Sequence, residues 1–221
     1  PAESAGARRR RARDLSRDVV TKADDVTRGA GEVYRIVGEG AFSPKALRNP
    51  QVQESLQVLD ERLRQLHLSV RNAIDEYLVG NTLIMDLISR HDLATRTVQH
   101  GLNVAVFATE IASQVLLKGD ESASTEREAQ IDSERLQLLQ KDLAEIFLGG
   151  FMHDCGLWSP DSAPGESHEA VGARLLWHIP EVKEFLPSLT RIVLFHSDVI
   201  RMATKPALVQ LIEYPDDPER T

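Results

Sequence analysis

The chain has 221 residues, of which 42% are hydrophobic, so it is long enough for one domain with a substantial core plus an extension. Its formal net charge of -8 argues against nucleic acid as a partner of the body of the protein. A single cysteine excludes an intramolecular disulfide, and we find no signal-peptide pattern and no uncharged apolar run long enough to cross a bilayer. We therefore expect a cytoplasmic protein that does not contact a membrane.

The composition predicts an all-α fold. Aromatic residues make up only 5% of the chain, and Leu, Ala, Val, Ile, Glu and Arg dominate. No alternating run rich in β-branched residues is long enough to require a strand. We expect a helical bundle preceded by N-terminal helices.

Residues 1–37 are predicted to form one polar helix with a thin apolar stripe at helical spacing. The stripe consists of Leu15, Val19, Val26, Val33, Ile36 and Val37. Glycines and a proline then interrupt the pattern, and a second helical pattern extends over residues 43–90. The stripe needs a partner surface, so we interpret residues 1–72 as an extension for homodimer formation or signalling.

A basic cluster, Arg8 to Arg11 and Arg13, lies in the first of these helices. Solvated helix surface is the interpretation that we favour for such a run of charges. The alternative is a contact with phosphates or with an acidic partner.

The next predicted helix spans residues 93–117. It aligns His100 with Thr97, Val104, Phe107, Ile111 and Val115, and we interpret that face as the buried one. A histidine there is either satisfied by a backbone group or reaches a site. The preceding pair His91 and Asp92 lies at a junction between helices, where Asp92 fits an N-cap. We therefore do not include this pair among the candidate functional residues.

An apolar segment from Phe147 to Met152 leads into His153 and Asp154. Gly149 and Gly150 within it predict a buried helix that another backbone approaches closely, because glycine otherwise costs about 1 kcal/mol in a helix interior. Taken alone, the doublet has a structural explanation, with the imidazole bonded to a carbonyl and the carboxylate capping the next turn. A metal ion near the helix end is the alternative explanation.

Two further helices carry histidines on apolar faces, after an exposed polar insertion at residues 118–132. His168 opens a helix behind the N-cap residue Ser167, and His196 lies on a helix of residues 187–200. Each repeats the arrangement found for His100.

Together, four helices direct His100, His153, His168 and His196 toward the core, with Asp154 beside them. Separate burial would require a polar partner for every ring, whereas one metal centre satisfies them together. Imidazole and carboxylate ligands without thiolate favour Fe or Mn, with Zn or Co as alternatives. Such a centre suits phosphoester hydrolysis, although the spacing does not name a substrate.

The ordered motifs resemble the HD superfamily of metal-dependent phosphohydrolases, and more closely its HD-GYP branch, the bacterial phosphodiesterases of cyclic di-GMP. The motifs are Thr97 with His100, His153-Asp154-x-Gly156, His168 with Gly172, and His196. The run from Asn81 through Asp92 and Thr95 to Ala105 looks like that branch's entry helix pair. The resemblance covers about residues 73–206, and we take residues 73–221 as an HD domain.

The resemblance implies a function and a set of ligands. His100, His153, Asp154, His168 and His196 match the family's metal ligands, with Asp154 also placed as the catalytic residue. The implied activity is hydrolysis of a cyclic dinucleotide, most readily cyclic di-GMP, by metal-activated water. One ion is expected, or two with help from Glu166, Glu169 or residues beyond Thr221.

The chain also departs from the HD-GYP pattern. Leu157 replaces a lysine expected near the substrate phosphate, and Ser197 replaces one imidazole of a His-His-Glu motif. Residues 201–206 retain only the proline of the Gly-Tyr-Pro stretch. Arg96 stands where some members carry a glutamate for an extra metal, so a third ion is not expected.

These departures leave a second function open. A catalytically impaired HD-type domain would bind a nucleotide or a protein partner without turnover. The HDOD branch, which lacks the metal chemistry, also fits the sequence of residues 168–180. The retained ligands argue against that branch and favour an enzyme.

Overall fold

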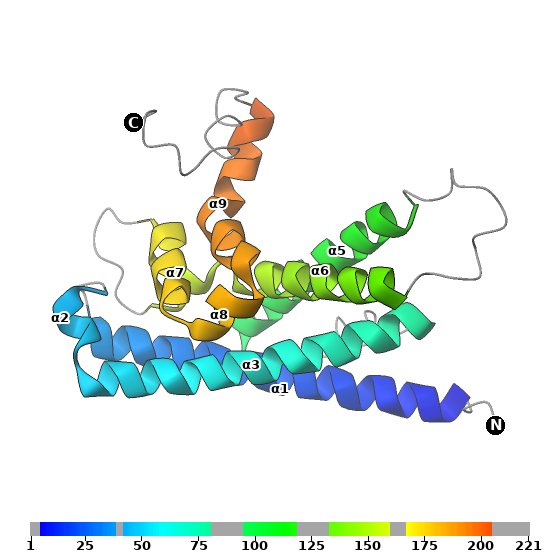
Figure 1. The fold of residues 1–221 in the computed structure, drawn as a ribbon, viewed down its shortest axis with the longest axis horizontal. Helices are drawn as coiled ribbons and strands as arrows, with labels where there is room; N and C mark the ends of the chain where they lie inside the picture. The colour runs from blue at the N-terminus through cyan, green and yellow to red at the C-terminus, as the bar shows by residue number, and fades with distance from the viewer. Residues whose placement is uncertain (1–4, 39–41, 81–94, 119–132, 160–166, 205–221) are drawn as a thin grey trace.

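The computed structural model describes residues 5–38, 42–80, 95–118, 133–159 and 167–204. All regular elements in these ranges are helices, which confirms the all-α prediction (Figure 1). In chain order they are α1 (Ala5–Val37), α2 (Pro44–Leu47), α3 (Pro50–Gly80), α5 (Arg96–Lys118), α6 (Ser133–Met152), the 3₁₀ helix η3 (Cys155–Trp158), α7 (His168–Trp177), α8 (Pro180–Phe185) and α9 (Pro187–Thr204).

The two long helices α1 and α3 form an antiparallel pair beneath the shorter helices (Figure 1). The chain reverses after Gly38, whose φ of 66° lies in the left-handed region that glycine adopts readily. Val19, Val26 and Val33 of the predicted stripe are fully buried, as are Leu59 and Leu63 of α3. The partner surface of the stripe is therefore α3 of the same chain.

The N-terminal helices are continuous with the rest of the core. The expected boundary between residues 72 and 73 falls inside α3, which has no break there. Beyond it, the Tyr77 hydroxyl of α3 donates a hydrogen bond to Glu110 of α5 at 2.6 Å. Formation of a homodimer stays a prediction, and the stripe that motivated it is covered.

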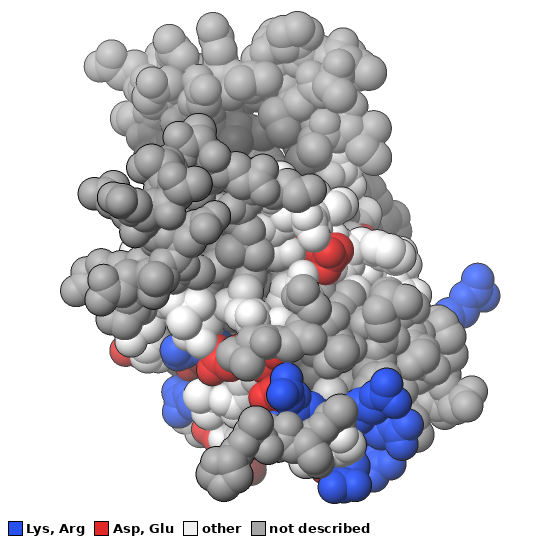
Figure 2. Space-filling view, turned by 90° about the vertical axis from the view of Figure 1, so that its right-hand side faces the viewer, with Lys and Arg blue, Asp and Glu red and all other residues white. Residues whose placement is uncertain are grey.

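The arginines of the basic cluster are exposed on α1. Figure 2 shows lysine and arginine side chains gathered at the lower edge of the face that carries the N-terminal end of the molecule. One member, Arg11, forms an ion pair with Glu76 of α3 at 3.2 Å. This contact and the exposure fit the solvated-surface interpretation.

Helix α5 buries a different face from the predicted one. Phe107, Ile111 and Val115 are 59%, 65% and 66% exposed, and the buried residues are Val98, Gly101, Leu102, Ala105, Val106, Thr109 and Ser113. The prediction was wrong because α5 carries apolar side chains on both faces, and small residues decide which one packs. A Cβ on Gly101 would lie 2.6 Å from the Phe151 carbonyl oxygen, so that face contacts α6 at backbone distance.

Gly150 of α6 performs the predicted role of admitting another backbone, whereas Gly149 meets a side chain instead. A Cβ on Gly150 would lie 2.7 Å from the Cα of Ala105, and one on Gly149 would lie 2.5 Å from the Ile192 side chain. Helices α5 and α9 thus approach α6 from two sides. This close packing brings three of the predicted histidine-bearing segments together.

A buried polar contact fastens α8 to α3. His67 Nδ1 lies 2.8 Å from a carboxylate oxygen of Glu181, and Arg64 contacts the other oxygen at 3.2 Å. Asp60 accepts a hydrogen bond from the Glu181 backbone N–H at 2.7 Å. Glu181 is only 3% exposed, so these partners supply the hydrogen bonds that water would otherwise make.

Several predicted segments lie outside the described residues: His91 with Asp92, the insertion after Lys118, Glu166, and the end of the Gly-Tyr-Pro region. Thr95 is described, and its hydroxyl accepts a 3.4 Å hydrogen bond from the Val98 N–H in the manner of an N-cap. Among the described helices, none combines the length and apolar character of a membrane span.

Replacing Glu181 by alanine should destabilise the fold by about 2 to 3 kcal/mol, because Arg64 and the buried His67 lose the carboxylate that they contact. Urea unfolding followed by circular dichroism measures this change in free energy. Glu184→Ala on the exposed side of the same helix is the control and should stay within about 0.5 kcal/mol of the parent. Equal stabilities of the two variants would contradict the role given to Glu181.

Candidate metal centre

The structure brings the five residues singled out in the sequence to one place. His100 comes from α5, and His153 and Asp154 follow the last residue of α6. His168 is the first residue of α7, and His196 lies on α9. We call these five residues the His/Asp centre.

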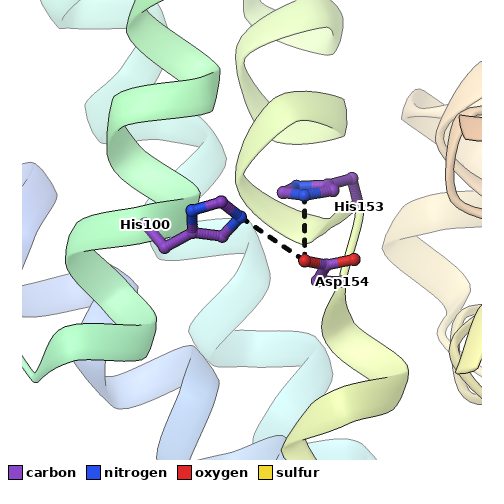
Figure 3. A group of neighbouring side chains, drawn as sticks. All are labelled: His100, His153 and Asp154. Carbon is purple, nitrogen blue, oxygen red and sulfur yellow. Dashed lines mark ion pairs between the residues drawn. The ribbon is translucent and has the colours of Figure 1, made fainter.

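Asp154 lies between the imidazoles and faces all four of them. Its Oδ2 atom lies 3.1 Å from His153 Nε2 and 3.4 Å from His100 Nε2 (Figure 3). Its Oδ1 atom lies 3.2 Å from both His168 Nε2 and His196 Nε2. Two groups of three donors therefore share one carboxylate, with one oxygen directed to each group.

The group of Asp154, His168 and His196 has the dimensions of part of a coordination shell. The Nε2 atoms of the two rings are 3.2 Å apart, so the three donor atoms form a triangle with equal sides. Ligands that each bind an ion at about 2.1 Å lie about 3.0 to 3.4 Å from one another in octahedral or tetrahedral geometry. The triangle fits one face of such a polyhedron.

The ring orientations favour a cation at the centre. His153 Nδ1 and His196 Nδ1 each lie 2.8 Å from a backbone carbonyl oxygen, of Gly150 and Val193 respectively. A carbonyl only accepts, so both Nδ1 atoms carry a proton. In the neutral rings the Nε2 lone pairs then face the Asp154 carboxylate, and a metal ion or added ring protons must balance these acceptors.

A backbone contact sets the position of His168 against Asp154. A Cβ on Gly156 would lie 1.8 Å from the His168 carbonyl oxygen, which leaves no room for a side chain. Across the same contact, a Cβ on Gly172 would lie 2.8 Å from Cys155 Sγ. The two glycines allow η3 and the first turns of α7 to pack in contact. This contact sets the position of His168 relative to Asp154 in the donor triangle.

The exposure of the rings differs across the centre. His153 has a side chain that is 13% exposed, whereas that of His100 is 59% exposed. Burial lowers the pKa of His153 against the opposing effects of the Gly150 carbonyl and the Asp154 charge, which favours the neutral ring that a metal ligand requires. The exposed His100 leaves the centre open to solvent on the α5 side.

Cys155 takes no part in either donor group among the described residues. It is fully buried, and burial raises the pKa of its thiol well above the ordinary value. The structure thus agrees with the expectation that this side chain is directed away from the doublet.

Sequence reasoning did not find the surroundings of Glu169. Its Oε2 atom lies 3.4 Å from His168 Nδ1, and its carboxylate accepts hydrogen bonds from the Ser197 and Ser167 hydroxyls. Partial burial raises the pKa of Glu169, but these bonds and its own backbone N–H outweigh burial, and the pKa falls to about 2. The only sequence signal was that Glu169 and Ser197 adjoin two of the histidines.

The position of the expected phosphate-binding lysine is open to solvent. Leu157 is 59% exposed at the end of the segment that carries Asp154. It contributes an apolar side chain there instead of a charge.

Comparisons of the chain with protein-family models, with curated proteins and with solved structures found no match. The resemblance to the HD superfamily therefore depends on the motifs in the sequence alone.

Replacing Gly156 by alanine should separate η3 from α7 and destabilise the fold by about 3 kcal/mol, because the new Cβ would overlap the His168 carbonyl. Affinity for Zn or Mn should fall in the same variant. Thermal unfolding and isothermal titration calorimetry measure the two effects. Gly6→Ala is the control, since a Cβ there meets nothing within 4 Å and should leave both quantities near those of the parent. Unchanged metal affinity in the Gly156 variant would disprove the dependence of the centre on this contact.

Proposed function

We propose that the protein is a metal-dependent phosphodiesterase that hydrolyses a cyclic dinucleotide, with cyclic di-GMP as the first substrate to test. The observation that carries the proposal is the convergence of four imidazoles from separate segments on the two oxygens of Asp154. The resemblance of the ordered motifs to HD-GYP phosphodiesterases supplies the substrate class.

The donor set supports one or two divalent ions. His168, His196 and Asp154 would hold one ion, and His100, His153 and the other oxygen of Asp154 would hold a second. Mixed nitrogen and oxygen ligands favour Fe or Mn, with Zn and Co as alternatives. When bound, such ions supply a Lewis acid for a phosphoryl oxygen and lower the pKa of a coordinated water.

The residues of the chain have definite tasks in this proposal. Asp154 orients both donor groups, and its charge offsets part of the positive charge of the ions. The carbonyls of Gly150 and Val193 hold two rings in the tautomer that binds metal. The side of the centre that is open at His100 admits the phosphodiester. A lysine or arginine at a position other than 157 neutralises the negative charge of the phosphate.

Freshly purified protein should contain at least one equivalent of divalent metal by elemental analysis and should hydrolyse cyclic di-GMP to a linear product. His153→Ala should reduce the turnover by more than about 100-fold, a larger effect than the 10- to 100-fold loss that an outer partner of a metal ligand causes. His178→Ala is the control, because this ring stacks on Phe42 and lies in neither donor group. A metal-free protein that stays inert toward cyclic dinucleotides with added Mn or Fe would refute the proposal.

The exposed Leu157 favours a second candidate function. A domain without a charge at this position binds a nucleotide or a protein partner through the same surface but does not turn it over. In that case His153→Ala should leave binding of labelled cyclic di-GMP, or of the protein partner, within about threefold of the parent. Loss of binding together with loss of metal would instead support the enzyme.

A further inference from the structure

The tautomer of each ring in the His/Asp centre depends on what its Nδ1 atom contacts, because a proton on Nδ1 leaves the Nε2 lone pair free for a ligand. His153 and His196 obtain this proton placement in the same way. His153 lies just after the end of α6, and His196 lies within α9. Each directs its Nδ1 atom to the carbonyl oxygen three residues earlier in the chain, at 2.8 Å. The backbone itself therefore fixes two of the rings.

His168 has no such helical carbonyl. It is the first residue of α7, directly after the N-cap residue Ser167, so the position three residues earlier precedes the helix. Its Nε2 atom nevertheless faces Asp154 and His196 at 3.2 Å, as in the other rings. Some other group must determine where its proton lies.

Glu169 occupies the required position. Its Oε2 atom lies 3.4 Å from His168 Nδ1, which is long for a hydrogen bond, so the negative charge acts chiefly by electrostatic attraction for the proton on that nitrogen. The side chain of Glu169 is 15% exposed, and solvent screening of the attraction is correspondingly reduced. The carboxylate thus performs the task that carbonyls perform for His153 and His196.

Two hydroxyl groups hold the carboxylate in place. Ser197 reaches it from α9, and Ser167 reaches it from the N-cap of α7. Ser197 directly follows His196 in the chain, so the same hydroxyl connects the helices that supply two members of the donor triangle. Outer-shell partners of this kind orient metal-binding histidines in many sites.

We propose that Glu169 is a positioning residue that holds His168 in the Nδ1–H tautomer, with Ser197 as its anchor. Glu169 belongs to neither group of mutually close donor atoms among the described residues, so it acts through His168 instead of as a ligand. The consequence for metal binding depends on the proposed metal-dependent function, whereas the tautomer itself does not.

The tautomer is measured on metal-free, ¹⁵N-labelled protein by two-bond ¹H–¹⁵N correlation at about pH 8.5, about two units above the ordinary pKa of histidine. His168→Gln identifies the signals of this ring. The parent should show the Nδ1–H form, whereas Glu169→Gln should show the Nε2–H form or a mixture, because the amide carries no negative charge. Glu169→Ala should show the same change, because it also lacks the negative charge.

A role of Glu169 in helix stability alone gives a different pattern. Both substitutions remove the negative charge from the first turn of α7, so both would lower the melting temperature alike without changing the tautomer. An unchanged His168 tautomer in folded Glu169→Ala would therefore overturn the proposal. Should that variant fail to fold by circular dichroism, Ser197→Ala takes its place and should shift the tautomer mixture in the same direction.

Metal affinity provides the second measurement. Titration with Zn should show affinity lowered by about 10- to 100-fold in Glu169→Ala and likewise in Glu169→Gln. Glu184→Ala, an exposed glutamate of α8, is the matched control and should match the parent. A parent that binds no metal would refute the proposed function and leave the tautomer result intact, whereas equal affinities of the parent and Glu169→Ala would refute the positioning role.

Discussion

The close contact between the backbone of η3 and the start of α7 determines the arrangement of the His/Asp centre. Asp154 lies just before η3 and His168 opens α7, so the distance between these two elements sets the distance between carboxylate and imidazole. Gly156 permits the contact from one side and Gly172 from the other. The other two approaches, of α5 and α9 to α6, depend in the same way on Gly150 and Gly149. Residues without side chains thus place the residues that carry the chemistry.

Much of this arrangement could be predicted from the sequence. Helical periodicity predicted α1, α3, α5, α6, α7 and α9, because long apolar stripes are a strong local signal. The convergence of His153, His168 and His196 also followed, since histidines on core-facing stripes require a common polar partner, whereas His100 joins them from an exposed position on α5. The role of Gly150 was also predicted, because glycine inside a helix needs an explanation, whereas Gly149 contacts the Ile192 side chain instead of a backbone.

Other features could not be predicted because they depend on tertiary packing and on contacts between residues far apart in the sequence. Helix α5 has two apolar faces. The face with the small residues Ala105 and Gly101 packs against α6, and the face with the larger Phe107 and Ile111 is exposed. The role of Glu169 as the partner of His168 could not be predicted, because the Ser197 hydroxyl that holds Glu169 comes from a helix almost thirty residues away. Ser197 looked like the loss of an imidazole, yet its hydroxyl bonds to the neighbour of another histidine. Leu157, by contrast, places an exposed apolar side chain where the resemblance leads us to expect a lysine.

The packing of α1 has a consequence for how this protein can be divided or recombined. Helix α1 contacts η3, and the backbone of Gly31 lies close enough to Trp158 for a Cβ there to sit 3.8 Å from its carbonyl oxygen. The indole of Trp158 in turn packs on Phe151 of α6, with ring centroids 5.5 Å apart. Helix α1 therefore packs directly against the segment that follows Asp154. Replacing α1 would remove its contacts to the segment that directly follows Asp154.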